Sequence, residues 1–135
     1  MDEIRVNDLA SRFAAICGAA HVEAGEGIGA RYQSDWLGKT ASEPAIVVRP
    51  ASTEEVAAVM KICAETRTPV IPFGGNSGLA SGTIARAEDQ VVKLSLERMN
   101  KVRRIDAPGR YMVAEAGCIG ESLQHAAAAE GLLFP

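Results

Sequence analysis

The sequence predicts an α/β (α+β) fold, with a lobe built on a βαβ unit and the start of a mixed or antiparallel second lobe. A buried-strand pattern at residues 45–48, a helical pattern at 52–63 and a strand pattern at 69–71 follow one another, as in a βαβ unit. A glycine-rich run, residues 74–82, comes directly after the second of these strands. Further along, two strand patterns flank the Pro-Gly turn at residues 108–109, which predicts an antiparallel hairpin.

Composition limits the classes of partner. The 135 residues are 47% hydrophobic, enough for one modest core, and the net charge of −3 is spread over interspersed signs. Without a basic patch we expect no nucleic-acid partner. No apolar run reaches the roughly 20 residues of a membrane span, and residues 1–5 are unlike a signal peptide, so we expect no transmembrane segment and a cytoplasmic location. Cys17, Cys63 and Cys118 are far apart with no nearby histidine, so no metal site is predicted.

A first helix is predicted near the N-terminus. Asn7 or Asp8 is a suitable cap, and Gly18 a suitable end. The apolar positions that recur at helical spacing are Leu9, Phe13 and Ile16. We expect residues 1–31 to form a helical leader that packs as an appendage, and residues 32–135 to form the main domain.

Residues 25–30 fit the pattern Gly-x-Gly-x-x-Ala of dinucleotide-binding proteins. Such a site needs a firm strand before the glycines and a long amphipathic helix after them. Residues 31–36 show no helical apolar stripe. We therefore reject a dinucleotide site at this position.

The βαβ unit has clear local signals. Residues 45–48 form a continuous apolar run, typical of a strand buried on both faces. Ser52 and Glu55 form a capping box, in which Ser52 caps the helix and Glu55 reaches back to the Ser52 N–H. The positions expected on the buried face of this helix are Val56, Val59, Met60 and Cys63.

The C-terminal third contains a further strand, a hairpin and a helix. Residues 91–94 have strand character, and the hairpin strands are residues 101–105 and 111–115. A helix then begins between Gly117 and Gly120 and ends at Gly131. The sequence finishes on an apolar segment, whereas domain ends are usually exposed and polar. We therefore expect the domain to continue beyond residue 135.

The glycine run carries the main functional signal. Parallel α/β sheets bind ligands at the carboxyl ends of their strands, where this run lies. Without side chains, successive N–H groups can converge on an anion such as a pyrophosphate. The alternative is an ordinary surface turn. The run lacks the Gly-Lys-Ser/Thr ending of a Walker loop, and no helical pattern begins at its last glycine.

Several motifs in order resemble a known family. They are Tyr32-x-x-Asp35-Trp36, Val47-Val48-x-Pro50, Ser52-Thr53-Glu54-Glu55-Val56, Pro72-x-Gly-Gly-Asn-Ser-Gly-Leu, Arg98-Met99-Asn100-Lys101-Val102, Glu115-Ala116-Gly117-Cys118 and Gly131-Leu132-Leu133-Phe134-Pro135. From about Tyr32 to the end, the sequence resembles the N-terminal part of FAD-linked oxidoreductases with the vanillyl-alcohol oxidase and p-cresol methylhydroxylase fold. Within that family it is most similar to D-2-hydroxyglutarate and D-lactate dehydrogenases.

The resemblance implies that residues 32–135 form an FAD-binding domain. The residues expected to contact noncovalent FAD are Pro72, Gly74, Gly75, Asn76, Ser77, Gly78, Leu79, Gly82, Gly117 and Pro135. It implies a parent enzyme that oxidises a D-2-hydroxy acid such as D-lactate, glycolate or D-2-hydroxyglutarate, with hydride transfer to flavin N5 and a separate electron acceptor. The catalytic and substrate-binding residues are then expected beyond Pro135, which leaves this chain alone without activity. The alternative is a stand-alone FAD- or nucleotide-binding module.

Three positions depart from the pattern of the family. Phe73 stands where a polar residue is usual, Ser77 replaces threonine, and Ser81 replaces glycine. Ser77 keeps a hydroxyl, so that change is mild. Phe73 removes a possible hydrogen bond to the cofactor. Ser81 is strained if its φ is positive.

Overall fold

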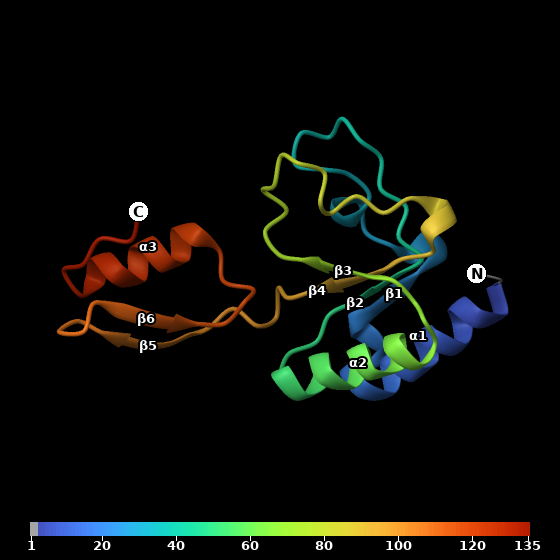
Figure 1. Ribbon diagram of the computed structural model, residues 1–135, viewed down its shortest axis with the longest axis horizontal. Helices are drawn as coiled ribbons and strands as arrows, with labels where there is room; N and C mark the ends of the chain where they lie inside the picture. Colours follow the sequence, from blue (N-terminus) through green and yellow to red (C-terminus); the bar gives the residue numbers. More distant parts are fainter. Residues whose placement is uncertain (1–2) are drawn as a thin grey trace.

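The computed structural model describes residues 3–135 and divides them into two lobes (Figure 1). The first lobe contains α1 (Glu3–Cys17), β1 (Val22–Ala24), β2 (Ile46–Val48), α2 (Thr53–Glu65), β3 (Val70–Phe73) and β4 (Val92–Ser95). The second contains β5 (Val102–Asp106), β6 (Tyr111–Ala114) and α3 (Gly120–Ala129). Short 3-10 turns lie at Ala19–His21, Gly25–Gly27, Ala30–Tyr32 and Ala87–Asp89. The predicted α/β (α+β) fold is confirmed, and of the two alternatives for the second lobe, mixed or antiparallel, the structure has the antiparallel one.

The first lobe is organised around a mixed four-stranded sheet in the order β1-β2-β4-β3. Strands β2, β4 and β3 are mutually parallel, and β1 is antiparallel to β2. The chain passes from β2 through α2 to β3, and β4 later inserts between these two strands. The carboxyl ends of three parallel strands therefore meet at one edge of the sheet, where the predicted glycine loop begins.

Helices α1 and α2 lie together on one side of this sheet, and the longer loops lie on the other (Figure 1). The core between helices and sheet consists of Leu9, Phe13, Cys17, Ile46, Val48, Val59, Cys63, Val92 and Leu94. Val47 points to the other side, where it packs with Ile28, Tyr32 and Phe73. Strand β2 is thus buried on both faces, as its continuous apolar run predicts.

Helix α1 differs from the expected appendage in two ways. It already includes Glu3, upstream of the predicted caps Asn7 and Asp8, and it is part of the main core. Leu9, Phe13 and Cys17 recur every four residues and are buried against the sheet, so this helix face is needed to cover the strands. Gly18 ends the helix with a positive φ of 89°, as predicted.

Helix α2 begins at the predicted capping box. The Glu55 N–H donates to Ser52 Oγ at 3.2 Å, but Glu55 Oε2 accepts from the N–H of Ala51, at 2.7 Å, and not from that of Ser52. Val59 and Cys63 are buried as expected. Met60 is 43% exposed, so its assignment to the inner face was wrong.

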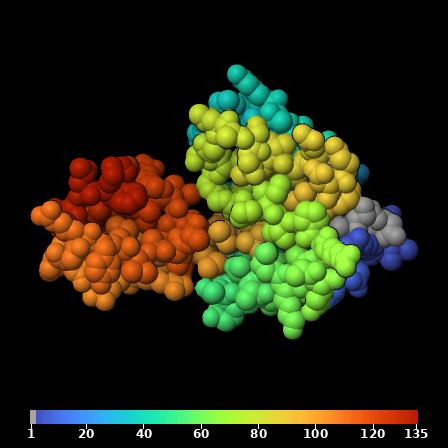
Figure 2. Space-filling model, viewed as in Figure 1, coloured from blue at the N-terminus to red at the C-terminus, as the bar shows by residue number. Residues whose placement is uncertain are grey.

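The second lobe is a hairpin with a helix beside it. Strands β5 and β6 pair antiparallel, which confirms the predicted hairpin. Helix α3 ends in a Schellman motif: the Gly131 N–H donates to the Ala128 carbonyl and the Leu132 N–H to the Ala127 carbonyl. Gly131 has a φ of 69°, as its predicted capping role requires. Figure 2 shows this lobe, orange to red, standing beside the first lobe with a notch between them.

Candidate functional site

The predicted glycine loop, residues 74–82, leaves the carboxyl end of β3 directly after Phe73, which pairs with Ser95 of β4. Its left-handed turns are made by Asn76 and Ser81, with φ of 56° and 58°, and not by its glycines. The possible strain at Ser81 is therefore present. A Cβ added at Gly74, Gly78 or Gly82 would meet no atom within 4 Å. The glycines thus leave a bare main-chain surface, which a ligand could approach closely.

Asn76 fixes the conformation of the loop. Its Nδ2 donates to the carbonyl of Ser34 at 3.2 Å, and its Oδ1 accepts from Thr83 Oγ1 at 2.8 Å. One side chain therefore ties the loop both to itself and to the preceding segment. Because its amide is engaged in this way, Asn76 would meet a cofactor mainly through its backbone.

A cavity of about 370 Å³ lies beside the start of the loop. It is lined by Arg31, Gly74, Glu97, Asn100, Gly117, Ile119 and Ser122. Two of the predicted site residues, Gly74 and Gly117, are therefore brought together, and a Cβ on Gly75 would lie 3.3 Å from Ile119 Cδ1. The cavity joins the glycine loop to the start of the second lobe.

The other predicted residues lie at varying distances from this cavity. Pro72 is within β3, paired with Leu94. Ser77, Gly78, Leu79 and Gly82 form the exposed outer part of the loop. Pro135 follows α3 in the second lobe and is not among the residues that line the cavity. Their contacts with a cofactor stay predictions.

Sequence reasoning missed most of the cavity wall. Glu97 and Asn100 follow β4 at the same edge of the sheet as the glycine loop, a signal that could have identified them. Arg31 lies in a 3-10 turn without periodicity, so no local pattern indicated it.

Gly117 is required by the packing of the chain itself. A Cβ at this position would lie 1.8 Å from the carbonyl oxygen of Leu96 and 2.8 Å from that of Met99. The Gly117 N–H donates to the Met99 carbonyl at 2.8 Å. The close backbone approach at Gly117 is made to the segment that leaves β4, and the expected contact of Gly117 with the cofactor stays a prediction.

Helix α3 begins at the same cavity. Its N-cap, Ile119, makes no side-chain capping hydrogen bond, and Ser122 of its first turn lines the cavity. Helix N-termini favour anions because their first N–H groups lack internal partners. Glu121 in the first turn carries an opposing negative charge.

A charge network forms the inner wall. Glu97 Oε2 lies 2.7 Å from Arg31 Nη1 and accepts a hydrogen bond from Tyr32 Oη at 3.0 Å. Glu97 Oε1 lies 3.6 Å from Arg49 Nη1, which is also 3.1 Å from Glu23 Oε1. Burial raises the pKa of the Tyr32 hydroxyl above its ordinary value.

Beneath this wall, Lys93 is fully buried in β4. Its Nζ donates to the main-chain carbonyl of Tyr32 at 2.6 Å and lies 5.0 Å from the centre of the Phe73 ring. Burial lowers the pKa of Lys93 to about 8. Phe73, the departure noted above, is also fully buried and packs edge-on against Tyr32, so its side chain supports the site from inside.

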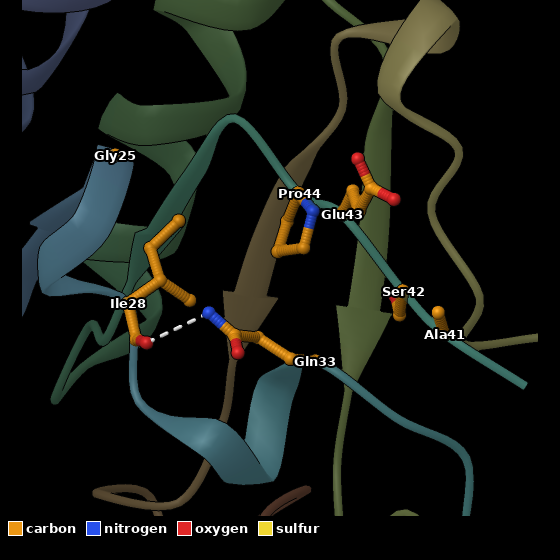
Figure 3. Close-up of a pocket in the computed structure, with 7 residues that line it drawn as sticks. All are labelled: Gly25, Ile28, Gln33, Ala41, Ser42, Glu43 and Pro44. Atoms are coloured by element: carbon orange, nitrogen blue, oxygen red, sulfur yellow. Dashed lines mark hydrogen bonds between the residues drawn. The ribbon is translucent and has the colours of Figure 1, made fainter.

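A second cavity, of about 320 Å³, lies away from the glycine loop (Figure 3). It is lined by Gly25, Ile28, Gln33, Ala41, Ser42, Glu43 and Pro44. Gln33 Nε2 donates to the Ile28 carbonyl at 3.0 Å, as Figure 3 shows, and Ser42 Oγ accepts from the Ala85 N–H. With these groups already paired and the Glu43 carboxylate on its wall, this cavity is poorly suited to a diphosphate.

Three parallel strands with a glycine loop at their carboxyl edge, beside an uncapped helix N-terminus, form an arrangement that could hold a phosphate-containing cofactor. The chain belongs to the FAD binding domain family, whose model matches residues 44–135. The resemblance to the vanillyl-alcohol oxidase and p-cresol methylhydroxylase family is thereby confirmed.

Curated relatives lie in the predicted branch. The D-lactate dehydrogenase of Archaeoglobus fulgidus is 38% identical over 95 residues, which are 70% of this chain and 21% of the relative. The D-2-hydroxyglutarate dehydrogenase of Xanthomonas citri pv. viticola is 36% identical over 104 residues, 77% of this chain and 22% of the relative. The chain thus spans about a fifth of the length of these relatives.

Solved structures share the fold. The 4-ethylphenol oxidase of Gulosibacter chungangensis matches with a TM-score of 0.82 and 25% identity, over 97% of this chain and 26% of that one. A p-cresol methylhydroxylase matches with a TM-score of 0.78 and 24% identity, over 98% of this chain and 26% of that one. Within residues 3–135, no helix has the length and apolar character needed to cross a membrane.

Proposed function

We propose that this chain is the FAD-binding part of a flavin-dependent dehydrogenase that oxidises a D-2-hydroxy acid. The observation that carries the proposal is the open space at Gly74, Gly78 and Gly82 of the loop, whose first glycine lines a cavity at the carboxyl edge of the sheet. The similarity to D-lactate and D-2-hydroxyglutarate dehydrogenases supports the substrate class. D-lactate, glycolate and D-2-hydroxyglutarate are the candidates, with a separate electron acceptor.

The glycine loop and the cavity at its start together fit a diphosphate. A cradle without side chains at Gly74, Gly78 and Gly82 allows phosphate oxygens to approach N–H donors, and Ser77 adds a hydroxyl. The positive end of α3 lies at the cavity, which Ile119 and Ser122 help to line. At about 370 Å³ the cavity takes only part of FAD, so the cofactor would extend along the exposed loop. When bound, FAD supplies the redox chemistry, accepting a hydride from the substrate.

The role of this chain is then to bind and orient the cofactor. Glu97 accepts a hydrogen bond from Tyr32 and pairs with Arg49 as well as with Arg31, so its carboxylate has no simple role as a base. We therefore place the catalytic base and the groups that bind the substrate carboxylate outside these residues. Covalent attachment of a flavin often uses a histidine side chain. Neither His21 nor His125 lines the cavity, which supports noncovalent binding of FAD.

A competition experiment tests the cofactor assignment. The 135-residue chain is titrated with FAD, followed by flavin fluorescence, and FAD is then displaced with ADP, ATP or riboflavin. The proposal expects saturable FAD binding that simple nucleotides displace only weakly. Displacement by ATP at concentrations comparable with FAD would favour a general nucleotide-binding module instead.

The substrate class is tested on the full-length protein that contains this chain. Reduction of an artificial electron acceptor is measured with D-lactate, D-2-hydroxyglutarate and the achiral glycolate, and with L-lactate and L-2-hydroxyglutarate as matched controls for the two chiral acids. The proposal expects turnover of at least one D-acid and at most weak turnover of its L-enantiomer. Lack of turnover with every hydroxy acid, in protein that retains FAD, would contradict the substrate assignment and leave FAD binding intact.

A further inference from the structure

Arg31 is the cationic side chain among the residues that line the cavity with Gly74 and Gly117. Its guanidinium stacks over two rings, with Cζ 5.2 Å from the centre of Tyr32 and 5.7 Å from that of Phe73. Phe73 directly precedes Gly74, so the stacking holds the charge beside the first residue of the glycine loop. These two contacts favour a guanidinium position close to the start of the glycine loop.

The donors of Arg31 are mostly unused. Within residues 3–135 its only ion pair joins Nη1 to Glu97 Oε2, and Nε and Nη2 make no hydrogen bond. The side chain is 54% exposed. An ion pair with this exposure is weak, because water screens it. Arg31 can therefore exchange partners at little cost.

Glu97 can release Arg31 without becoming an unpaired charge. It keeps the hydrogen bond from Tyr32 Oη at 3.0 Å and the ion pair with Arg49 at 3.6 Å. Arg49 in turn is held by Glu23. When Arg31 exchanges its partner, Glu97 keeps these two contacts, and Glu23 and Glu97 share the one positive charge of Arg49.

We propose that Arg31 is an anion-binding residue of this cavity, which exchanges the Glu97 carboxylate for the diphosphate oxygens of the cofactor. A planar guanidinium with parallel N–H groups matches phosphate oxygens, and the glycine loop offers N–H groups from the other side. This inference rests on the proposed function, since FAD supplies the diphosphate. In the absence of cofactor, Glu97 acts as its internal competitor.

The two partners of the ion pair then have opposite effects on binding. Replacing Arg31 with glutamine removes a charge-assisted contact and weakens diphosphate binding by about tenfold. Replacing Glu97 with glutamine removes the competing charge but keeps an acceptor for Tyr32, and strengthens binding by about threefold. A purely structural ion pair predicts weaker binding in both variants.

The test uses inorganic pyrophosphate as a probe that does not require flavin recognition. The ¹⁵N-labelled 135-residue chain is titrated with pyrophosphate, and the Nε–Hε signal of Arg31 and the loop amides are followed by NMR. The variants are Arg31→Gln, Arg31→Lys and Glu97→Gln. Arg86→Gln is the matched control, because Arg86 is exposed and makes no ion pair among the described residues. FAD titrations of the same variants run in parallel.

We expect pyrophosphate to shift the Arg31 signal saturably, with weaker binding in Arg31→Gln, partial recovery in Arg31→Lys, tighter binding in Glu97→Gln and no change in Arg86→Gln. Equal binding of pyrophosphate and FAD by wild type and Arg31→Gln overturns the inference and leaves the FAD assignment standing. Pyrophosphate binding through Arg31 without any FAD binding supports the anion site and overturns the proposed function. Lack of binding of either ligand to the folded chain overturns both.

Discussion

Nζ of Lys93 lies 2.6 Å from the main-chain carbonyl oxygen of Tyr32. The contact joins the middle of the central strand β4 to the 3-10 turn Ala30–Tyr32, which carries Arg31 to the cavity. Lys93 has no carboxylate partner within residues 3–135, so its charge is buried at a cost in desolvation. The hydrogen bond from Lys93 fixes the position of that 3-10 turn.

Lys93 makes stability depend on pH in a defined window. Its pKa is about 8 in the folded chain and 10.5 as the ordinary value, so between these pH values the unfolded chain binds more protons. The free energy of unfolding should therefore rise with pH, by about 3 kcal/mol over the whole window. Lys93→Met removes this contribution. Urea unfolding at pH 7.5 and 10 gives the free energy of unfolding of each protein. The value for wild type minus the value for Lys93→Met should increase from pH 7.5 to pH 10. Parallel pH curves for the two proteins would contradict the buried charge.

Cys17 contributes with the opposite sign at alkaline pH, which is why the comparison uses a variant. Burial raises the pKa of its thiol from 9.0 to about 11. The unfolded chain loses this proton first, so stability falls as the pH rises between these values. Both proteins in the comparison share Cys17, so its effect cancels.

Ser81 holds a left-handed conformation with a φ of 58°, and its neighbour Ala80 does not. Ser81→Gly removes strain of about 1 kcal/mol but adds freedom to the unfolded chain, so we expect a change in stability from zero to about 1 kcal/mol stabilising. Ala80→Gly relieves no strain and only increases the conformational freedom of the unfolded chain, so it should destabilise the fold by about 0.5–1 kcal/mol. Thermal unfolding of the two variants measures the difference. Equal destabilisation by both would contradict the strain at Ser81.

Gly117 should tolerate no side chain. A Cβ 1.8 Å from the Leu96 carbonyl oxygen forces the backbone between the lobes to move. We expect Gly117→Ala to destabilise the chain by about 3 kcal/mol or more, at the upper end of overpacking effects. Gly82→Ala, which places a methyl group in open space, is the matched control and should change stability by less than about 1 kcal/mol. Similar unfolding midpoints for the two variants would contradict the packing described here.

Asn76 should control the order of the glycine loop. Asn76→Gly accepts the left-handed φ but loses the bonds to Ser34 and Thr83, with a cost of about 1–2 kcal/mol. Because the loss is local, amide hydrogen exchange in residues 74–83 should accelerate while exchange in the sheet is unchanged. FAD affinity should fall as well. Unchanged exchange in the loop would show that Asn76 does not hold it.

The regular elements could be predicted because their signals are local. The apolar run that ends at Val48, the cap at Ser52 and the αL glycine at Gly131 each determine structure through neighbours in sequence. Helix α1 was misjudged because its amphipathic pattern cannot reveal whether it packs on the sheet or outside it. Where the helix packs depends on which face of the sheet the other elements leave uncovered, and this is a property of the tertiary structure.

The candidate site was only partly predictable for the same reason. The glycine loop could be predicted from its high glycine content, and its place at the carboxyl edge of the sheet from the βαβ order of the elements. Arg31 and Ile119 reach the cavity from segments far apart in sequence, and no periodicity links them. The left-handed φ of Asn76, which glycine-rich composition would have assigned to a glycine, was also beyond local inference.

The central claim, that residues 74–82 bind the diphosphate of FAD, is tested most directly by charge at one glycine. Gly78→Asp and Gly78→Asn add side chains of nearly equal size to open space, and only the first adds a negative charge. Gly27→Asp, also in open space but outside the loop, controls for net charge. We predict that FAD affinity falls at least about tenfold more in Gly78→Asp than in Gly78→Asn, and stays near wild type in Gly27→Asp. Equal FAD affinity in the two Gly78 variants would contradict the claim.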